Sequence, residues 1–268
     1  MFSPQIFTSV INSYLPEPQA SLLNGIIFGV NLKTTKVFYE QLKIVGLLHI
    51  VVLSGINITL LTVIIGKLTE NLGKQLSILL TILIVILFVI FVGPKAPIIR
   101  AAFMGILTLV SILYGRKNLV YYSLFLSIIL IAIFWPKWLT SISFQLSYSA
   151  TLGLIIFNKK IHVNSKNVIV RFFNYIKNEF YTSVIAQVFT APIIFINFKQ
   201  ISIIAPLSNI LISWTIVPLM IFGFTTSILG KVNYWLGVIP AYICHGILTY
   251  IVFVIETLSK IPGALVQF

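Results

Sequence analysis

Acidic residues are the scarcest group in this sequence. Its 268 residues include five acidic side chains, all of them glutamate, against 18 lysines and arginines. Charged residues make up only 9% of the chain and apolar residues 59%, and the mean hydropathy is +1.07. A soluble domain is closer to a quarter charged. The composition therefore excludes an ordinary soluble domain and predicts an all-α integral membrane protein in contact with the lipid bilayer.

The residues that enzymes and metal sites require are equally sparse. A single cysteine, Cys244, excludes an internal disulfide. His49, His162 and His245 are too far apart in the chain to suggest a metal site, and no glutamate lies in the middle of an apolar window. A dyad of Ser54 and His49 would place its two side chains about 140° apart on a helix. We therefore expect no enzymatic activity, no metal and no cofactor.

Charged residues divide the chain into apolar windows of membrane-spanning length. A helix needs about 20 apolar residues to cross a bilayer. Windows of roughly this length or longer are 44–66, 75–94, 95–115, 118–136, 138–158, 180–198, 200–230 and 232–255. Window 200–230 is longer than one span requires and contains Pro206 and Pro218, so we expect a broken helix there, with a re-entrant piece. The sequence predicts about eight spans, within a range of seven to nine.

Three regions and an orientation follow from this division. Residues 1–43 form a lead-in that ends in an amphipathic surface helix, residues 44–260 the transmembrane domain, and residues 261–268 a short tail. A second surface helix is predicted in the basic segment 159–179. Placing the N-terminus outside puts ten basic residues in inner loops and seven in outer loops. Because Lys and Arg favour the cytoplasmic side, both termini are expected outside and 159–179 inside.

Polar side chains interrupt the first window, 44–66. On a continuous helix His49, Ser54 and Asn57 fall roughly on one side. Gly55 thins the backbone beside them, so that another segment can approach closely. Polar groups inside a membrane face either a neighbouring helix or a wet cavity. A polar seam between helices and a solvated pathway are both compatible with this pattern.

The stretch GLLHIVVLSGINITLL (46–61) resembles the signature of the ComEC competence family, which reads roughly G-x-x-H-L-L-A-x-S-G-x-H and continues with apolar residues. The matching residues are Gly46, His49, Ser54 and Gly55. Asn57 stands where the family usually has a second histidine. This departure keeps a hydrogen-bonding side chain but removes a titratable one, which argues against proton transfer at this position.

Further segments resemble the same family in the same order. The segment PIIRAAFMG (97–105) is similar to its P-x-x-R-A-x-x-M motif, and WPKWLTSISFQLSYSATLGL (135–154) is similar to its F-Q-L-S box. Pro206, Asn209 and Pro218 are similar to its P…N-x-x-x-x-P stretch. Together these similarities extend over about residues 20–230.

The resemblance implies a channel core that passes single-stranded DNA across the bacterial cytoplasmic (inner) membrane during natural transformation. Family members usually add an extracellular OB-fold and a metallo-β-lactamase-like domain, and this sequence contains no H-x-H-x-D-H motif of the latter. The expected partners are therefore a separate extracellular nuclease or OB-fold subunit and a cytoplasmic translocation motor. An oligomer is compatible with the sequence.

The candidate pathway combines one charge with several amides and hydroxyls. Arg100 lies in an apolar window, where a charged residue is either functional or a snorkelling anchor near a helix end. The predicted pathway-lining residues are His49, Ser54, Gly55, Asn57, Arg100, Gln145, Ser147, Gln187 and Asn209. Such a lining would attract a phosphodiester strand without trapping it. The same inventory also suits a small-solute or ion transporter, or a structural membrane subunit, that shares the motifs without handling DNA.

Overall fold

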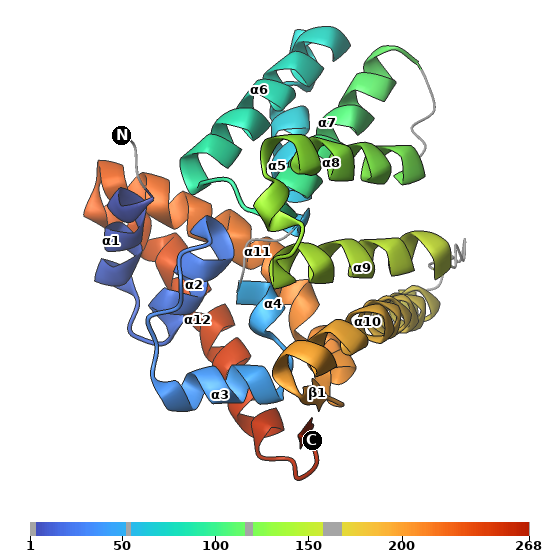
Figure 1. The fold of residues 1–268 in the computed structure, drawn as a ribbon. Helices are drawn as coiled ribbons and strands as arrows, with labels where there is room; N and C mark the ends of the chain where they lie inside the picture. The colour runs from blue at the N-terminus through green and yellow to red at the C-terminus, as the bar shows by residue number, and fades with distance from the viewer. Residues whose placement is uncertain (1–3, 52–54, 116–119, 158–167, 268) are drawn as a thin grey trace.

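The computed structural model describes residues 4–51, 55–115, 120–157 and 168–267, and almost all of them lie in helices (Figure 1). The N-terminal helices are α1 (Gln5–Tyr14), α2 (Gln19–Phe28), α3 (Lys36–Ile44) and α4 (Leu48–Val51). The middle of the chain forms α5 (Gly55–Leu68), η1 (Glu70–Leu72), α6 (Lys74–Val92), α7 (Ala96–Leu113), α8 (Val120–Phe134), η2 (Pro136–Trp138) and α9 (Ile142–Phe157). The remainder forms α10 (Val168–Phe198), β1 (Gln200–Ser202), α11 (Ala205–Val232), α12 (Tyr234–Ser259) and β2 (Leu265–Gln267). The predicted all-α class is confirmed.

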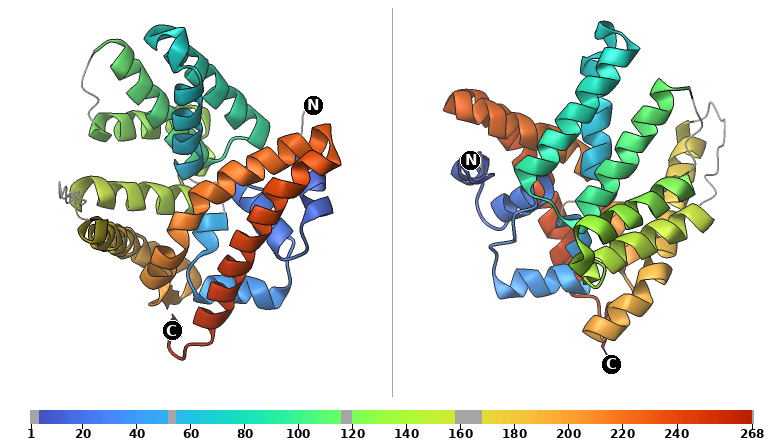
Figure 2. Two further views of the ribbon diagram at one scale, coloured as in Figure 1. Left: turned by 180° about the vertical axis from the view of Figure 1, so that it is seen from behind. Right: turned by 45° about the horizontal axis from the view of Figure 1, so that its top comes forward.

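The helices form groups that surround α4, which lies at the middle of the molecule (Figures 1 and 2). Helices α5, α6, α7 and α8 make one group, α9 packs along α10, and α1 to α3 pack on the hairpin of α11 and α12. The two short strands pair antiparallel, with Ser202 opposite Leu265. This pairing places the C-terminal end of the described chain beside the start of α11.

Five described helices are long and apolar enough to cross a membrane, namely α6, α7, α11, α12 and the part of α10 over Phe173–Phe198. They correspond to five of the eight windows. Helices α8 and α9 and the part of α5 over Asn57–Leu68 are apolar but have fewer than 18 residues. A helix of 15 residues is about 22 Å long, which is less than the roughly 30 Å of a hydrocarbon core. The finer prediction of seven to nine spans is therefore neither confirmed nor contradicted.

Two long helices differ from the predicted division of the chain. The segment 200–230 is not a broken helix, because α11 runs without a break from Ala205 to Val232. Pro206 lies in its first turn, where the missing N–H has no partner to lose, and Pro218 is accommodated inside the helix. The second surface helix was predicted over 159–179, of which 159–167 lie outside the described residues. Residues 168–179 are not a separate element but the start of the 31-residue α10, because neither glycine nor proline separates them from the apolar part of that helix.

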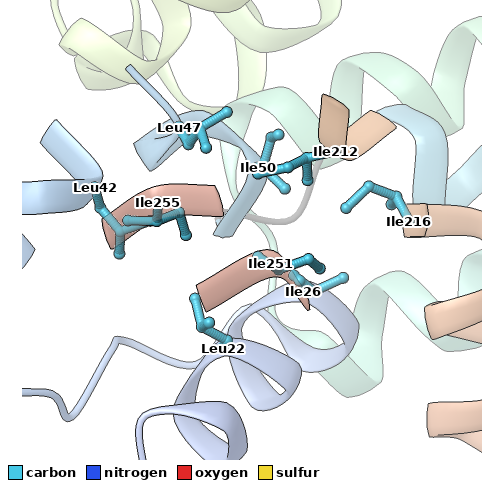
Figure 3. A pocket seen from close by; sticks show the side chains of 9 residues that line it. All are labelled: Leu22, Ile26, Leu42, Leu47, Ile50, Ile212, Ile216, Ile251 and Ile255. Carbon is cyan, nitrogen blue, oxygen red and sulfur yellow. The ribbon is translucent and has the colours of Figure 1, made fainter. Parts of the chain in front are cut away.

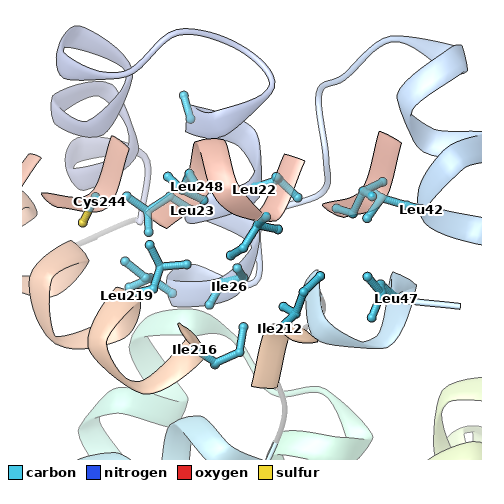
Figure 4. Packing of buried hydrophobic residues seen from close by; sticks show 14 of the residues in the cluster. Leu22, Leu23, Ile26, Leu42, Leu47, Ile212, Ile216, Leu219, Cys244 and Leu248 are labelled. Atoms are coloured by element: carbon cyan, nitrogen blue, oxygen red, sulfur yellow. The ribbon is translucent and has the colours of Figure 1, made fainter. Parts of the chain in front are cut away.

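The most buried element is α2, which belongs to the predicted lead-in. Every residue from Ala20 to Phe28 is buried. Side chains of α2 pack against α11 and α12, and Figure 4 shows Leu23 and Ile26 facing Leu219 and Leu248. At 10 residues α2 is too short to span, as its sequence indicates, but it lies at the centre of the core.

A small apolar pocket lies between α2 and the start of the signature segment (Figure 3). It is lined by leucine and isoleucine side chains alone, which are Leu22, Ile26, Leu42, Leu47, Ile50, Ile212, Ile216, Ile251 and Ile255. Leu47 and Ile50 come from the signature segment. Apolar packing thus anchors the start of the signature segment, and the described polar residues of the segment do not line this pocket.

Candidate functional site

The predicted cation lies in a hydrogen-bonded cluster between three helices. Arg100 of α7 is half-buried, and its Nε donates to the Oγ of Ser147 on α9 at 2.9 Å. Its guanidinium carbon lies 5.8 Å from the centre of the Tyr148 ring, within the range of a cation–π contact. The Tyr148 hydroxyl in turn donates to the Oγ of Ser127 on α8 at 2.8 Å. We call Gly55, Arg100, Ser127, Ser147 and Tyr148 the arginine cluster.

Gly55 joins this cluster because α5 and α7 approach closely there. A methyl group built on Gly55 would lie 3.8 Å from Nη2 of Arg100 and 3.5 Å from the Cβ of Ala101. Any larger side chain would therefore contact the guanidinium or displace it. The helix contacts bring the signature segment, the P-x-x-R-A segment and the F-Q-L-S box to one place, although about 90 residues separate the first from the last.

The arginine cluster holds a positive charge without a carboxylate partner. All five glutamates belong to the part of the chain that the structure describes, and none of them forms an ion pair with Arg100. The ion pair found among the described residues joins Lys43 and Glu40 at 3.5 Å. Arg100 is held instead by a hydroxyl and an aromatic face, which stabilise a guanidinium without neutralising it. No carboxylate among the described residues therefore neutralises this charge.

Asn57 has a different environment from the arginine cluster. It is 3% exposed, and its Nδ2 donates to the carbonyl oxygen of Ile26 at 2.6 Å. The Nζ of Lys95 donates to the carbonyl of Gly29 at 2.9 Å. Both carbonyls belong to the C-terminal end of α2, whose last turn has no intrahelical partners for them. Asn57, which belongs to the neighbouring α5, therefore supplies a hydrogen-bond donor to a carbonyl at the end of a buried helix.

A third group of polar contacts surrounds the start of the signature. Gln187 of α10 donates through Nε2 to the Ser202 carbonyl, and Ser202 Oγ donates to the Ile44 carbonyl at 2.6 Å. Gly46 has a φ of +73°, and a methyl group on it would lie only 2.6 Å from the Cβ of Ala205. We call Ile44, Gly46, Gln187, Ser202 and Ala205 the strand junction. It fixes the signature against β1 and the start of α11.

The other predicted residues lie outside the arginine cluster. His49 of α4 is exposed, and its Nδ1 lies 2.9 Å from the Gly46 carbonyl, which requires a proton on Nδ1 for a hydrogen bond. Asn209 donates through Nδ2 to the Oγ of Ser183 at 2.7 Å and links α11 to α10. Gln145 is half-buried on α9. Ser54 lies outside the described residues.

The structure thus brings Gly55, Arg100 and Ser147 together and separates the rest. Three contributors were not predicted from the sequence, namely Ser127, Tyr148 and Ser202. Tyr148 directly follows Ser147 in the F-Q-L-S-Y segment, so its position in the motif could have indicated it. Ser127 and Ser202 carry no comparable signal, because each is one of many serines in apolar surroundings. Among the residues that the structure describes, no group of three histidine, cysteine or glutamate side chains could hold a metal.

These features define the chain as an all-α membrane protein with an uncompensated cation between its helices. The chain belongs to the competence protein family, whose sequence model matches residues 26–268. It is also similar to ComE operon protein 3 of Bacillus subtilis, with 25% identity over 205 residues. That alignment includes 76% of this chain and 25% of the relative, so the chain spans about a quarter of the relative's length. No solved structure is significantly similar to the chain.

Proposed function

We propose that this chain forms the core of a conduit for single-stranded DNA across the bacterial cytoplasmic membrane during natural transformation. The observation that carries the proposal is Arg100, a cation in an apolar helix that none of the five glutamates pairs with. A permanent positive charge in such a place is costly unless an anion compensates it. A phosphodiester strand supplies one negative charge per nucleotide as it passes.

The arginine cluster suits a strand that must pass and not remain. Its one guanidinium provides attraction, and Ser147 and Tyr148 orient it through neutral contacts. Several fixed cations would bind a polyanion too tightly for passage, whereas a single one guides it. An extracellular nuclease or OB-fold subunit would supply single strands, and a cytoplasmic motor would pull them. The conduit itself carries out no chemical reaction in this proposal.

The alternative is a small-solute or ion transporter, or a structural membrane subunit, of the same family. It is favoured by the internal pairing of Asn57, Gln187 and Asn209, whose amide groups all donate to protein oxygens. Paired amides stabilise helix contacts equally well in a protein that never binds DNA. The two proposals differ in whether the charge of Arg100 is needed for DNA import.

The test is uptake of labelled DNA in transformable cells deleted for their own channel and supplied with this chain and its extracellular partner. Arg100→Gln should lower uptake about tenfold, which is the value of one charge-assisted contact. Arg100→Lys should retain part of the uptake, because attraction of a phosphate depends more on the positive charge than on the planar donor geometry of the guanidinium. Lys137→Gln, which removes an exposed charge in η2, is the matched control. Unchanged import by Arg100→Gln at equal protein level would favour the alternative.

A further inference from the structure

A second polar site lies at one end of the helix bundle, away from the arginine cluster. It is a groove of about 500 Å³ between the segment before α2, the start of α3 and the end of α12. Its polar lining consists of Glu17, Lys33, Thr34, Thr35, Gln41 and Glu256. The volume lies within the range of small-ligand sites. Two of the five glutamates of the chain, which are far apart in sequence, thus share one groove.

Opposite charges line this groove without neutralising each other. In the described part of the chain, Lys33 forms no ion pair with Glu17 or Glu256, although all three line the same groove. All three side chains are exposed, so each can reach a ligand. A groove lined by both acidic and basic side chains matches a ligand that carries both charges.

Hydrogen bonds hold the Glu17 carboxylate and the backbone on both sides of the groove. The Ser21 amide donates to Oε2 of Glu17 at 3.2 Å, and the Ser21 hydroxyl donates to the Lys33 carbonyl at 2.9 Å. Thr35 caps α3 by accepting from the amide of Phe38 at 3.3 Å. One serine thus connects the two segments that carry Glu17 and Lys33, which preorganises this part of the groove for binding.

The groove lies at one end of a helix that is long enough to span a membrane. Glu256 is in the last turns of α12, a helix long enough to span a membrane, and α3 packs beside this end of α12 (Figure 1). Val37, which also lines the groove, is 69% exposed, as expected of an apolar side chain that contacts lipid at a membrane surface.

We propose that this groove binds the zwitterionic headgroup of a phospholipid with a primary ammonium, such as phosphatidylethanolamine. The ammonium donates to the carboxylates of Glu17 and Glu256, and the phosphate accepts from Lys33 and the hydroxyl of Thr34 at the N-terminal end of α3. A trimethylammonium headgroup has the same charges but no N–H donor. The site does not depend on the proposed passage of DNA.

The test is native mass spectrometry of the purified full chain with phosphatidylethanolamine, phosphatidylcholine or phosphatidylglycerol. We expect phosphatidylethanolamine to bind about tenfold more tightly than phosphatidylcholine, as the loss of charge-assisted donors predicts. The double substitution Glu17→Gln and Glu256→Gln should abolish this preference, and Lys33→Met should weaken binding of the phosphate. Glu70→Gln and Lys36→Met remove charges of the same sign outside the groove. Both variants should keep the preference for phosphatidylethanolamine.

Each result decides the proposal. Equal binding of the two zwitterionic lipids, or an unchanged preference in the double variant, overturns it. Displacement of the lipid by soluble phosphoethanolamine supports recognition of the headgroup. Binding of phosphoethanolamine without any binding of the lipid assigns the groove to a free metabolite and overturns the proposal of a lipid ligand. Thermal unfolding without added lipid serves as the folding control, and the double variant should match the unmodified chain.

Discussion

Arg100 of α7 donates from Nε to the Oγ of Ser147 on α9 at 2.9 Å, and this bond joins two motifs that are 47 residues apart. The bond uses one of the donors of the guanidinium and fixes its direction. The remaining donors and the charge are not matched by any glutamate. The geometry therefore distinguishes the charge of Arg100 from its orientation, and the two can be tested separately.

Ser147→Ala removes the orienting acceptor and leaves the charge. We expect DNA uptake to fall by a smaller factor than in Arg100→Gln, about threefold, because the substitution removes one hydrogen bond of the guanidinium but keeps its positive charge. Ser149→Ala on the same helix is the control, since Ser149 Oγ donates only to the Leu146 carbonyl. Labelled-DNA uptake at matched protein level is the measurement. A loss in Ser147→Ala as large as that in Arg100→Gln would contradict this order.

Asn57→Leu should destabilise the protein by about 1–3 kcal/mol, because it leaves the Ile26 carbonyl at the end of α2 buried without a donor. Asn57→His should be better tolerated, since an imidazole N–H can donate in its place. Thermal unfolding in detergent measures both. The control is Asn197→Leu, because that exposed side chain bonds only to its own helix, at the Ile193 carbonyl. Equal stability of Asn57→Leu and Asn197→Leu would refute the capping role.

Gly46→Ala should be among the most damaging glycine substitutions. Its φ of +73° disfavours a side chain, and the added methyl would lie 2.6 Å from the Cβ of Ala205. We expect a loss of about 1–3 kcal/mol in the free energy of unfolding. Gly246→Ala is the control, because a methyl there has no heavy atom within 4 Å, and helix propensity should make it neutral or slightly stabilising. A similar melting temperature for both variants would contradict the close approach at the strand junction.

The orientation predicted from the basic residues can be tested with single cysteines. Cys244 is buried, so a Cys244→Ala background removes the native thiol without changing the surface. Arg171→Cys in the first part of α10 should resist a membrane-impermeant thiol reagent in intact cells, whereas Lys137→Cys in η2 should react. Both positions are exposed. The opposite labelling pattern would invert the predicted topology.

Apolar composition and charge spacing were sufficient to predict the class of this protein, because a bilayer imposes length and polarity on each span separately. The windows 75–94 and 232–255 correspond closely to α6 and α12 for that reason. The order of the motifs was likewise readable, and it led to the family that the comparison confirms. These properties depend on local sequence alone.

Tertiary structure decided where the polar residues act. Local sequence placed His49, Ser54 and Asn57 on one helical face, but Asn57 pairs with the buried end of α2, and Arg100 pairs with Ser147 on another helix. Window length likewise could not reveal that α2 is the centre of the core, because burial of a short helix depends on the helices that pack around it. A side chain's hydrogen-bonding capacity belongs to its residue type, whereas its partner depends on which helices the fold brings together.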